Sequence, residues 1–312
     1  MNISAVVPVY NETDSLHQLH QELAAILPDA GRHEIIYIDD GSSDGSGTVL
    51  KEIADGDSRV QVISFYRNYG KAAALAAGFE AAAGDVVVTL DSDLQDDPAE
   101  VPAMIELLNQ GWDMVSGWKK VRHDPLTRRL PSWLFNFVVR FMTGVSIHDS
   151  NCGLKVYRAE VVKSVEVYGG LHRYIPALAK YNGFKVTEKV IQHRPRLHGK
   201  TKYGLARYFH GLLDLFTVLF LGRYFQRPLH FFGLVGILLL LAGLVVSIYL
   251  TINWFAGVPI GNRPLFFLGI LLIIVGIQFF SLGLLAELFV QRRHREQQLI
   301  KEVYPEQHQA KG

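Results

Sequence analysis

Two aspartates separated by one residue, Asp91 and Asp93, are the side chains of this sequence best suited to chemistry. They follow the apolar run at residues 86–90, so both carboxylates can turn towards one ligand just past the end of a strand. Carboxylate oxygens suit Mg²⁺ or Mn²⁺, and Gln95 can supply a further oxygen beside water and phosphate ligands. The spacing predicts a divalent-metal site, although surface loops also contain such a pair by chance.

Two more acidic residues, Asp96 and Asp97, stand directly before Pro98, which suits the first turn of a helix. For these two we favour the simpler interpretation that they begin a helix and interact with the positive end of its dipole.

Polar clusters also end two earlier apolar runs. Tyr10, Asn11 and Glu12 follow the first run, and Asp39 and Asp40 follow the second and precede a Gly-Ser turn. One of these aspartates can accept hydrogen bonds from a nucleobase or ribose while the other caps or braces the loop. A plain Asx turn accounts for either aspartate equally well, so both interpretations stay open.

Short apolar runs alternate with helical patterns through this part of the chain. Strands are predicted at residues 3–9, 34–38, 60–65, 86–90 and 114–118, and helices at residues 16–26, 71–83 and 98–109. This alternation is typical of α/β proteins with a mostly parallel sheet flanked by helices. Ligands of open sheets bind beyond the carboxyl ends of the strands, which is where the polar clusters fall.

Composition argues against several classes of protein. The 31 basic and 30 acidic residues leave a net charge of +1, which argues against binding to nucleic acid. Cys152 is the only cysteine, which excludes an internal disulfide and a multi-cysteine metal site. The patterns GxGxxG, GxxxxGK[ST] and HExxH are absent, so a usual dinucleotide fold, a P-loop ATPase and a zinc protease lack support.

Two long apolar runs, residues 231–255 and 265–290, follow the α/β part. Each exceeds the roughly 20 residues that cross a bilayer, and the short turn-rich linker between them predicts a transmembrane hairpin. Glu287 lies inside the second run and is expected to snorkel or to pair with Arg292.

Basic residues set the expected topology of this hairpin. Arg223 and Arg227 precede it and three arginines follow it, whereas only Arg263 lies in the linker. The positive-inside rule therefore places both chain ends in the cytoplasm. The N-terminal residues show no signal-peptide pattern, so the α/β part is expected to be cytoplasmic, on a multi-pass protein of the inner membrane.

The chain thus divides into four expected parts. Residues 1–203 form a cytoplasmic catalytic domain, and residues 229–291 form the two-helix transmembrane hairpin. Residues 204–228 alternate apolar and basic side chains, which is typical of amphipathic helices at a membrane interface or packed on the catalytic domain. Residues 292–312 form a polar cytoplasmic tail.

Four motifs occur in order along the α/β part: PVYNE at residues 8–12, DDGSSDG at 39–45, GKAAALAAGF at 70–79 and DSDLQDDP at 91–98. Together they resemble family 2 glycosyltransferases of the GT-A fold, a Rossmann-like sheet flanked by helices. Within that family the chain is similar to dolichol-phosphate mannose synthases and to bacterial polyprenyl-phosphate glucosyltransferases, whose membrane hairpin it shares.

The resemblance implies roles for individual residues. It implies that the nucleotide-sugar donor is held by Pro8, Tyr10, Asn11, Glu12, Ile38, Asp40, Asp91, Ser92, Lys119, Arg196 and Lys202, and the metal by Asp91, Asp93 and Gln95. Arg196 and Lys202 lie in HRPRLHGKTKYG, where the family carries a phosphate-binding basic pair. Lys119 stands where relatives often have Arg, which lowers the expectation of a bidentate phosphate contact.

Asp93 and Asp149 are the candidate catalytic residues, which position the sugar. Asp149 precedes a segment, SNCGLKVYR, in which Leu154 and Lys155 depart from the commoner Phe-Arg. Arg122, Arg128 and Arg129 are candidates for binding the acceptor phosphate, with solvated surface positions as an equal alternative.

The implied activity is transfer of one hexose from a nucleotide sugar, UDP-glucose first, to a polyprenyl phosphate such as undecaprenyl or dolichyl phosphate. Mg²⁺ or Mn²⁺ is the implied cofactor, and the lipid-linked product serves glycosylation of lipopolysaccharide or cell wall. A flippase, a downstream glycosyltransferase and a second copy of the chain are the expected partners. Alternatives are a GDP-mannose-dependent synthase, a processive polysaccharide synthase, which would usually carry QxxRW and more spans, and a non-catalytic nucleotide-sugar scaffold.

Overall fold

The computed structural model describes residues 1–27, 33–120, 126–194, 214–215, 217–219, 228–260 and 263–294, except for the side chains of residues 126–134 and 290–294. The chain forms two compact units, Met1–Leu219 and Phe220–Gly312. Their boundary falls within the segment at residues 204–228, most of which lies outside the described residues. The expected division into four parts therefore stays a prediction.

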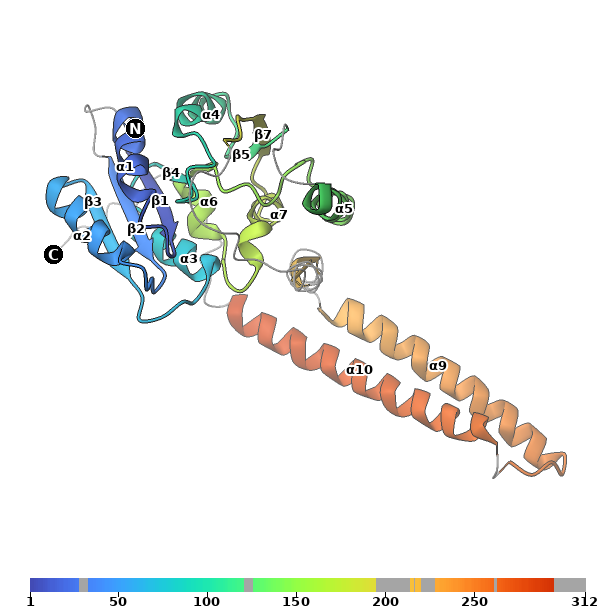
Figure 1. Cartoon of the computed structure of the whole chain (residues 1–312). Helices are drawn as coiled ribbons and strands as arrows, with labels where there is room; N and C mark the ends of the chain where they lie inside the picture. Colours follow the sequence, from blue (N-terminus) through green and yellow to red (C-terminus); the bar gives the residue numbers. More distant parts are fainter. Residues whose placement is uncertain are drawn as a thin grey trace, which may run out of the picture. The chain divides into compact units, whose positions relative to one another are not determined.

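The first unit is built on one seven-stranded sheet with the strand order β3-β2-β1-β4-β6-β5-β7 (Figure 1). The strands are β1 (Ile3–Val9), β2 (Glu34–Asp39), β3 (Val60–Ser64), β4 (Val86–Thr89), β5 (Met114–Trp118), β6 (Lys155–Arg158) and β7 (Val186–Val190). All pairs are parallel except those that β6 makes with β4 and β5. The expected α/β fold with a mostly parallel sheet is confirmed, and β6 and β7 are strands that the sequence patterns did not predict.

Helices connect the strands. They are α1 (Leu16–Ile26), α2 (Ser46–Gly56), α3 (Lys71–Ala81), α4 (Val101–Asn109) after the short 3₁₀ turn η1 (Pro98–Glu100), α5 (Leu126–Thr143), α6 (Ala159–Ser164), and α7 (Ile175–Tyr181) after η2 (Leu171–Arg173). The predicted strands and helices fall at these places, with differences of one or two residues at their ends.

The central strands are apolar because both faces of the sheet are covered. In β1, Ala5 and Val7 pack in a core with α1, α2 and α4, whereas Val6 packs on the other face with α3, α6 and α7. Alternate side chains of a strand point to opposite faces, so both sets must be apolar. Helix α3 approaches the sheet closely at Gly78, where a Cβ atom would lie 2.9 Å from Cδ1 of Ile38.

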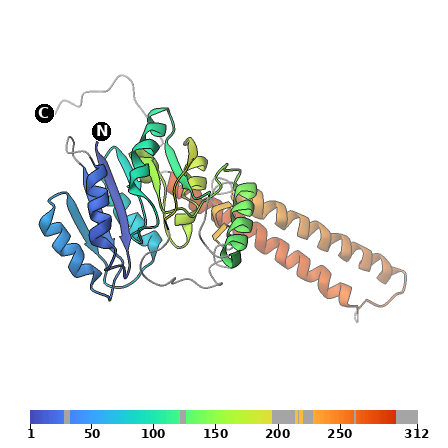
Figure 2. The same ribbon diagram turned by 45° about the horizontal axis from the view of Figure 1, so that its top comes forward.

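The second unit contains α9 (Pro228–Phe255) and α10 (Pro264–His294), which run side by side (Figures 1 and 2). Two stretches, Pro228–Phe255 and Pro264–Phe289, are long and apolar enough to cross a membrane, with mean hydropathies of 2.8 and 2.6. Only 17% and 11% of their most apolar windows are buried, which distinguishes them from the core helices of a soluble protein.

Glycines bring the two helices together. A Cβ atom on Gly236 would lie 2.8 Å from the carbonyl oxygen of Gly276, and the reverse distance is also 2.8 Å. Small residues allow such close backbone approach between helices in lipid. At the end of the hairpin, Oε2 of Glu287 accepts a hydrogen bond of 3.2 Å from the backbone N–H of Leu229. Glu287 therefore binds the first turn of α9, while the Arg292 side chain, its expected partner, is not described.

We expect Gly236→Leu to lower the midpoint of thermal unfolding of the chain in detergent, followed by circular dichroism. The added side chain would collide with the backbone of α10, and overpacking of this kind costs about 1–3 kcal/mol. Ser281→Leu is the matched control, because Ser281 lies on α10 and is exposed. Equal midpoints for the two variants would contradict the glycine contact.

Candidate active site

Parallel pairing brings three polar clusters of the sequence to one edge of the sheet. Strands β2, β1 and β4 are neighbours, so the residues that follow them meet there. Ser42 Oγ accepts a hydrogen bond from the backbone N–H of Asn11 at 3.0 Å, and the backbone N–H of Ser43 donates to Asn11 Oδ1 at 2.8 Å. Ser15 Oγ donates to the carbonyl of Ser92 at 2.6 Å. The predicted convergence of these clusters is therefore present.

The turn after β2 fixes the chain around Glu12. Ser46 Oγ accepts from the backbone N–H of Glu12 at 3.0 Å and donates to Asp44 Oδ1 at 2.6 Å. Although burial opposes ionisation, hydrogen bonds from Ser46 and Thr13 lower the pKa of Asp44 to about 2. Asp44 and Ser46 were not predicted to be site residues, although the DDGSSDG motif contains Asp44.

Asp40 and Asp39 have different partners. The carboxylate of Asp40 accepts hydrogen bonds from Tyr69 N at 2.7 Å, Gly70 N at 2.9 Å and Asn68 Nδ2 at 3.0 Å. Burial outweighs these bonds and raises the pKa of Asp40. Asp39 Oδ1 accepts from Ser42 N at 2.9 Å. Asp40 thus braces the loop before α3, and its contact with the donor stays a prediction.

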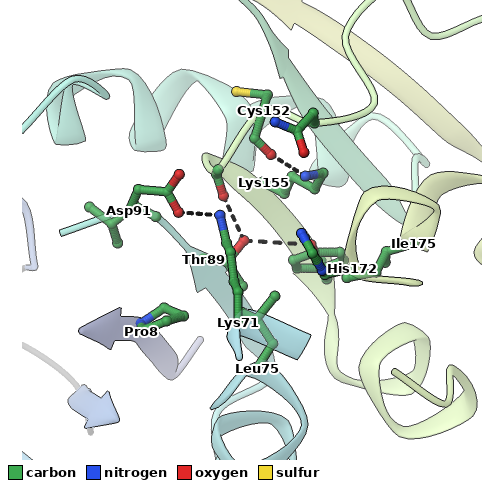
Figure 3. Close-up of a pocket in the computed structure, with 13 residues that line it drawn as sticks. Pro8, Lys71, Leu75, Thr89, Asp91, Cys152, Lys155, His172 and Ile175 are labelled. Atoms are coloured by element: carbon green, nitrogen blue, oxygen red, sulfur yellow. Dashed lines mark hydrogen bonds and ion pairs between the residues drawn. The ribbon is translucent and has the colours of Figure 1, made fainter. Parts of the chain in front are cut away.

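The loop before α3 places the ammonium group of Lys71 next to Asp91. Helix α3 begins at Lys71, directly after Gly70, whose φ of 91° is readily adopted only by glycine. The ammonium group of Lys71 forms an ion pair with Asp91 Oδ1 (Figure 3). Burial alone would raise the pKa of Asp91, but the charge of Lys71 outweighs it and lowers the pKa. The motif GKAAALAAGF contains Lys71, but nothing in its spacing pointed to this partner.

A small pocket lies beside Asp91, between the sheet and the segments around α3 and α7 (Figure 3). Its polar lining includes Lys71, Thr89, Lys155 and His172. Lys155 is buried and its ammonium group donates to the carbonyl of Cys152. Burial lowers the pKa of Lys155, and burial together with the charge of Lys71 lowers that of His172 well below its usual value. The pocket lining therefore contains the side-chain nitrogens of Lys71 and Lys155 and the uncharged imidazole of His172.

The DSD turn holds the remaining predicted metal ligands. Leu94 has a φ of 59°, and Gln95 N donates to Asp93 Oδ1 at 3.2 Å. Among the described residues, no three His, Cys, Asp or Glu side chains gather in a metal-binding group. Two carboxylates and one amide nevertheless fit a divalent ion that shares its coordination with phosphate oxygens, and Asp91 already attracts one cation, Lys71.

Asp96 does not have the helix-start role that was predicted for it. It is 1% exposed, and its Oδ1 lies 2.6 Å from Nζ of Lys119. Burial alone would lower the pKa of Lys119, but the Asp96 carboxylate outweighs it and raises the pKa. Only Asp97 acts at the helix start, where Oδ1 accepts from Ala99 N at 2.9 Å. The prediction that Asp96 is a helix-start acid was therefore wrong, because it neutralises a buried lysine.

Asp149 is 2% exposed, and the residues on both sides of it are held in place. The backbone N–H of His148 donates to Glu188 Oε2 at 2.7 Å, and its ring also contacts the Glu188 carboxylate. The same ring stacks on Trp118, with centroids 4.2 Å apart. On the other side, Ser150 N donates to Asn136 Oδ1 at 3.4 Å. Glu188, which sequence reasoning missed, fixes the chain that carries Asp149.

The other residues predicted to bind the donor differ in how far their side chains are exposed. Pro8 lines the pocket and Tyr10 is 37% exposed, whereas Ser92 is buried. The Ile38 side chain packs in the core, so its contact with a donor would have to come from its backbone. Arg122, Arg196 and Lys202 lie outside the described residues, as do the side chains of Arg128 and Arg129.

The chain matches known proteins over its whole length. Residues 4–165 match the model of Glycosyl transferase family 2. Dodecaprenyl-phosphate galacturonate synthase of Rhizobium johnstonii is 36% identical over 321 residues, which cover 99% of this chain and 95% of the relative. The chain is a family 2 glycosyltransferase. Undecaprenyl-phosphate 4-deoxy-4-formamido-L-arabinose transferase of Pseudomonas aeruginosa is 38% identical over 291 residues, 91% of this chain and 84% of the relative.

Solved structures agree on the fold of this glycosyltransferase. Glucosyl-3-phosphoglycerate synthase from Mycobacterium tuberculosis, solved with Mn²⁺, UDP and phosphoglyceric acid, has a TM-score of 0.55 at 18% identity. The match covers 71% of this chain and 78% of the solved one. The expected GT-A fold and the resemblance to family 2 are confirmed.

We expect Lys71→Met to lower kcat/KM of this glycosyltransferase by about 10- to 100-fold, because the candidate site loses the cation that pairs with Asp91. The acidic limb of the pH profile should also move to higher pH, since the strongest of the charges that lower the pKa of Asp91 is then removed. Steady-state transfer assays across pH measure both effects. Lys51→Met removes an exposed lysine of α2 and should change neither.

We expect Asp96→Ala to destabilise the catalytic unit by about 3–5 kcal/mol, because it leaves Lys119 buried without its partner. Asp97→Ala, which removes the neighbouring helix cap and a partly exposed ion pair with Arg194, should cost about 1–2 kcal/mol. Urea unfolding in detergent, followed by intrinsic fluorescence, compares the two. Equal losses would show that the Lys119 ion pair is not needed for stability.

Proposed function

We propose that this glycosyltransferase is a membrane-bound, inverting enzyme that transfers a single hexose from a nucleotide sugar to a polyprenyl phosphate. The observation that carries the proposal is one chain with an acidic pair, Asp91 and Asp93, at the carboxyl edge of its sheet and two helices of membrane-spanning length. Relatives that match both parts carry dodecaprenyl-phosphate and undecaprenyl-phosphate in their names.

The donor that we place first is UDP-glucose, with GDP-mannose as the alternative. The names of the relatives add galacturonate and 4-deoxy-4-formamido-L-arabinose as sugars to be compared. A processive polysaccharide synthase is less favoured, because the sequence lacks QxxRW.

The reaction is a single displacement at the anomeric carbon. An oxygen of the lipid phosphate forms the new bond to this carbon while the bond to the donor's phosphate oxygen breaks, and the nucleoside diphosphate leaves. The acceptor phosphate is already anionic, so a strong general base is not needed. Catalysis then depends on charge and position, for which Lys71 stands beside Asp91 and the buried Asp149 is held by its neighbours.

Mg²⁺ or Mn²⁺ would be held by Asp91, Asp93 and Gln95 and, when bound, would neutralise charge on the leaving diphosphate. Pro8, Tyr10 and Glu12 would contact the nucleotide at the end of β1. Asp93 and Asp149 would position the sugar, and Arg196 and Lys202 would bind donor phosphates. Arg122, Arg128 and Arg129 would bind the acceptor phosphate.

The expected location is the cytoplasmic membrane, with the catalytic unit and both chain ends on the cytoplasmic side. The product would then require a flippase before a downstream glycosyltransferase uses it, and the small membrane anchor favours self-association of the chain.

The test is incubation of the purified chain with a panel of nucleotide sugars, undecaprenyl phosphate and Mg²⁺ or Mn²⁺, with mass spectrometry of the lipid. One donor should give a lipid-linked monosaccharide, and Asp93→Asn should lower the rate by at least about 100-fold. Absence of glycolipid with every donor would refute the proposal. Nucleotide-sugar binding without turnover, unchanged in Asp93→Ala, would instead support a scaffold.

A further inference from the structure

The chain that follows β7 runs beside the loop that carries the candidate metal ligands. His193 forms an antiparallel β-bridge with Asp96, and the backbone N–H of Arg194 donates to the carbonyl of Gln95 at 3.0 Å. The backbone N–H of Gln95 in turn donates to Asp93 Oδ1 at 3.2 Å. The backbone of Gln95 is therefore bonded twice, once to a neighbouring candidate ligand and once to the chain after β7.

The guanidinium group of Arg194 connects this loop to helix α1. Its Nη2 lies 2.8 Å from Oδ1 of Asp97, and its Nη1 donates to Oε2 of Glu22 at 2.7 Å. Glu22 lies on α1, where Nε2 of Gln18 donates to its other carboxylate oxygen at 3.0 Å. We call Arg194, Glu22 and Asp97 the Arg194 clasp. It joins three separate parts of the chain: the segment after β7, the loop after β4, and α1.

The Arg194 clasp is better shielded from water than an ordinary surface ion pair. The side chains of Arg194, Glu22 and Asp97 are 34%, 25% and 18% exposed. Burial alone would lower the pKa of Arg194, but its hydrogen bonds to Glu22 and Asp97 outweigh burial and raise the pKa. A planar guanidinium group can hold two carboxylates through separate N–H groups, which suits it to fix two elements at once.

Further contacts join the same two segments at a greater distance from Gln95 along the chain. The ammonium group of Lys189 pairs with Glu100 at the end of η1, and the backbone N–H of Gln192 donates to the same carboxylate at 3.2 Å. These contacts do not involve the Arg194 clasp. Loss of the clasp should therefore leave the segments attached through η1 and release the loop from α1 without unfolding the unit.

We propose that Arg194 is a positioning residue for the divalent-metal site, because it fixes the loop that carries Asp93 and Gln95 against α1. The inference rests on the proposed function, in which these two residues and Asp91 hold Mg²⁺ or Mn²⁺. Arg194 is not itself a ligand and acts through the backbone of Gln95 and through Asp97. A loop that is already fixed loses less conformational freedom when an ion binds, so the outer contact raises the affinity for the metal.

The test measures binding of Mn²⁺ to the full chain in detergent by electron paramagnetic resonance, which records the free ion. UDP and, in a parallel series, GDP are added, and protein-free samples correct for the Mn²⁺ that each diphosphate binds. The variants Arg194→Met and Glu22→Gln each break the Arg194 clasp. Arg59→Met is the matched control, because Arg59 pairs with Asp57 before β3 at similar exposures of 32% and 15%. This pair lies at the amino-terminal end of β3, away from the candidate site.

We expect Arg194→Met and Glu22→Gln each to raise the dissociation constant of Mn²⁺ by about tenfold, and Arg59→Met to leave it unchanged. Charge alone predicts opposite effects, because loss of a cation near the loop would tighten Mn²⁺ binding whereas loss of an anion would weaken it. Weaker binding in both variants therefore distinguishes positioning from electrostatics. The double variant should bind Mn²⁺ as Arg194→Met does, since both substitutions break the same contact.

Three results would overturn the inference. Unchanged or tighter Mn²⁺ binding in Arg194→Met, while the parent chain binds Mn²⁺, would overturn the positioning role and leave the proposed function intact. Equally weakened binding in Arg194→Met, Glu22→Gln and Arg59→Met would also overturn it, because a general loss of stability would then explain the effect. A parent chain that binds no Mn²⁺ with either diphosphate would refute the metal ligands of the proposed function and the positioning role with them.

Discussion

The ion pair between Lys71 and Asp91 is the interaction around which the active site is arranged. The Asp91 carboxylate, which we propose as a metal ligand, has to stay ionised in surroundings that are partly closed, and the neighbouring Lys71 ammonium group lowers its pKa. The position of Lys71 depends in turn on Gly70, whose backbone N–H binds Asp40. The motif that begins at Asp39 is therefore linked to Asp91 through the loop before α3.

Two largely buried lysines among the described residues of the catalytic unit have polar partners. Lys119 has Asp96 beside it, and its pKa is raised although burial would lower it. Lys155 has the carbonyl of Cys152 as its partner, and burial lowers its pKa. An ionised group without a partner in such surroundings costs several kcal/mol, so these contacts stabilise the two lysines in their buried positions. Lys71 is the lysine that contacts the predicted metal ligand.

The two units have different requirements for packing. In the sheet unit, apolar side chains on both faces of the central strands exclude water and hold the polar edge in place. In the hairpin, the helices approach through glycines and leave large apolar side chains on the outside. Lipid gives no hydrophobic drive for helix association, so close backbone contact takes over that role.

Local sequence patterns were enough to predict the α/β class, most strands and helices, the two membrane-length helices, the family and the convergence of the motifs after β1, β2 and β4. These properties depend on local periodicity and on the rule that parallel strands end at one edge, both of which can be read along the chain. Which charged groups form pairs, in contrast, depends on how the elements pack in three dimensions. Lys71 and Asp91, Lys119 and Asp96, and Glu188 and His148 are pairs formed between separate elements.

The fold also changed the interpretation of single residues. Asp96 was expected at a helix start, but it forms an ion pair with the largely buried Lys119. The carboxylate of Asp40 accepts hydrogen bonds from the loop before α3. Strand β6 was not predicted from the sequence, and its first residue, Lys155, lines the pocket. Local sequence records the type and spacing of such residues, but their partners are set by strand order and helix packing, and ionisation depends on the partner.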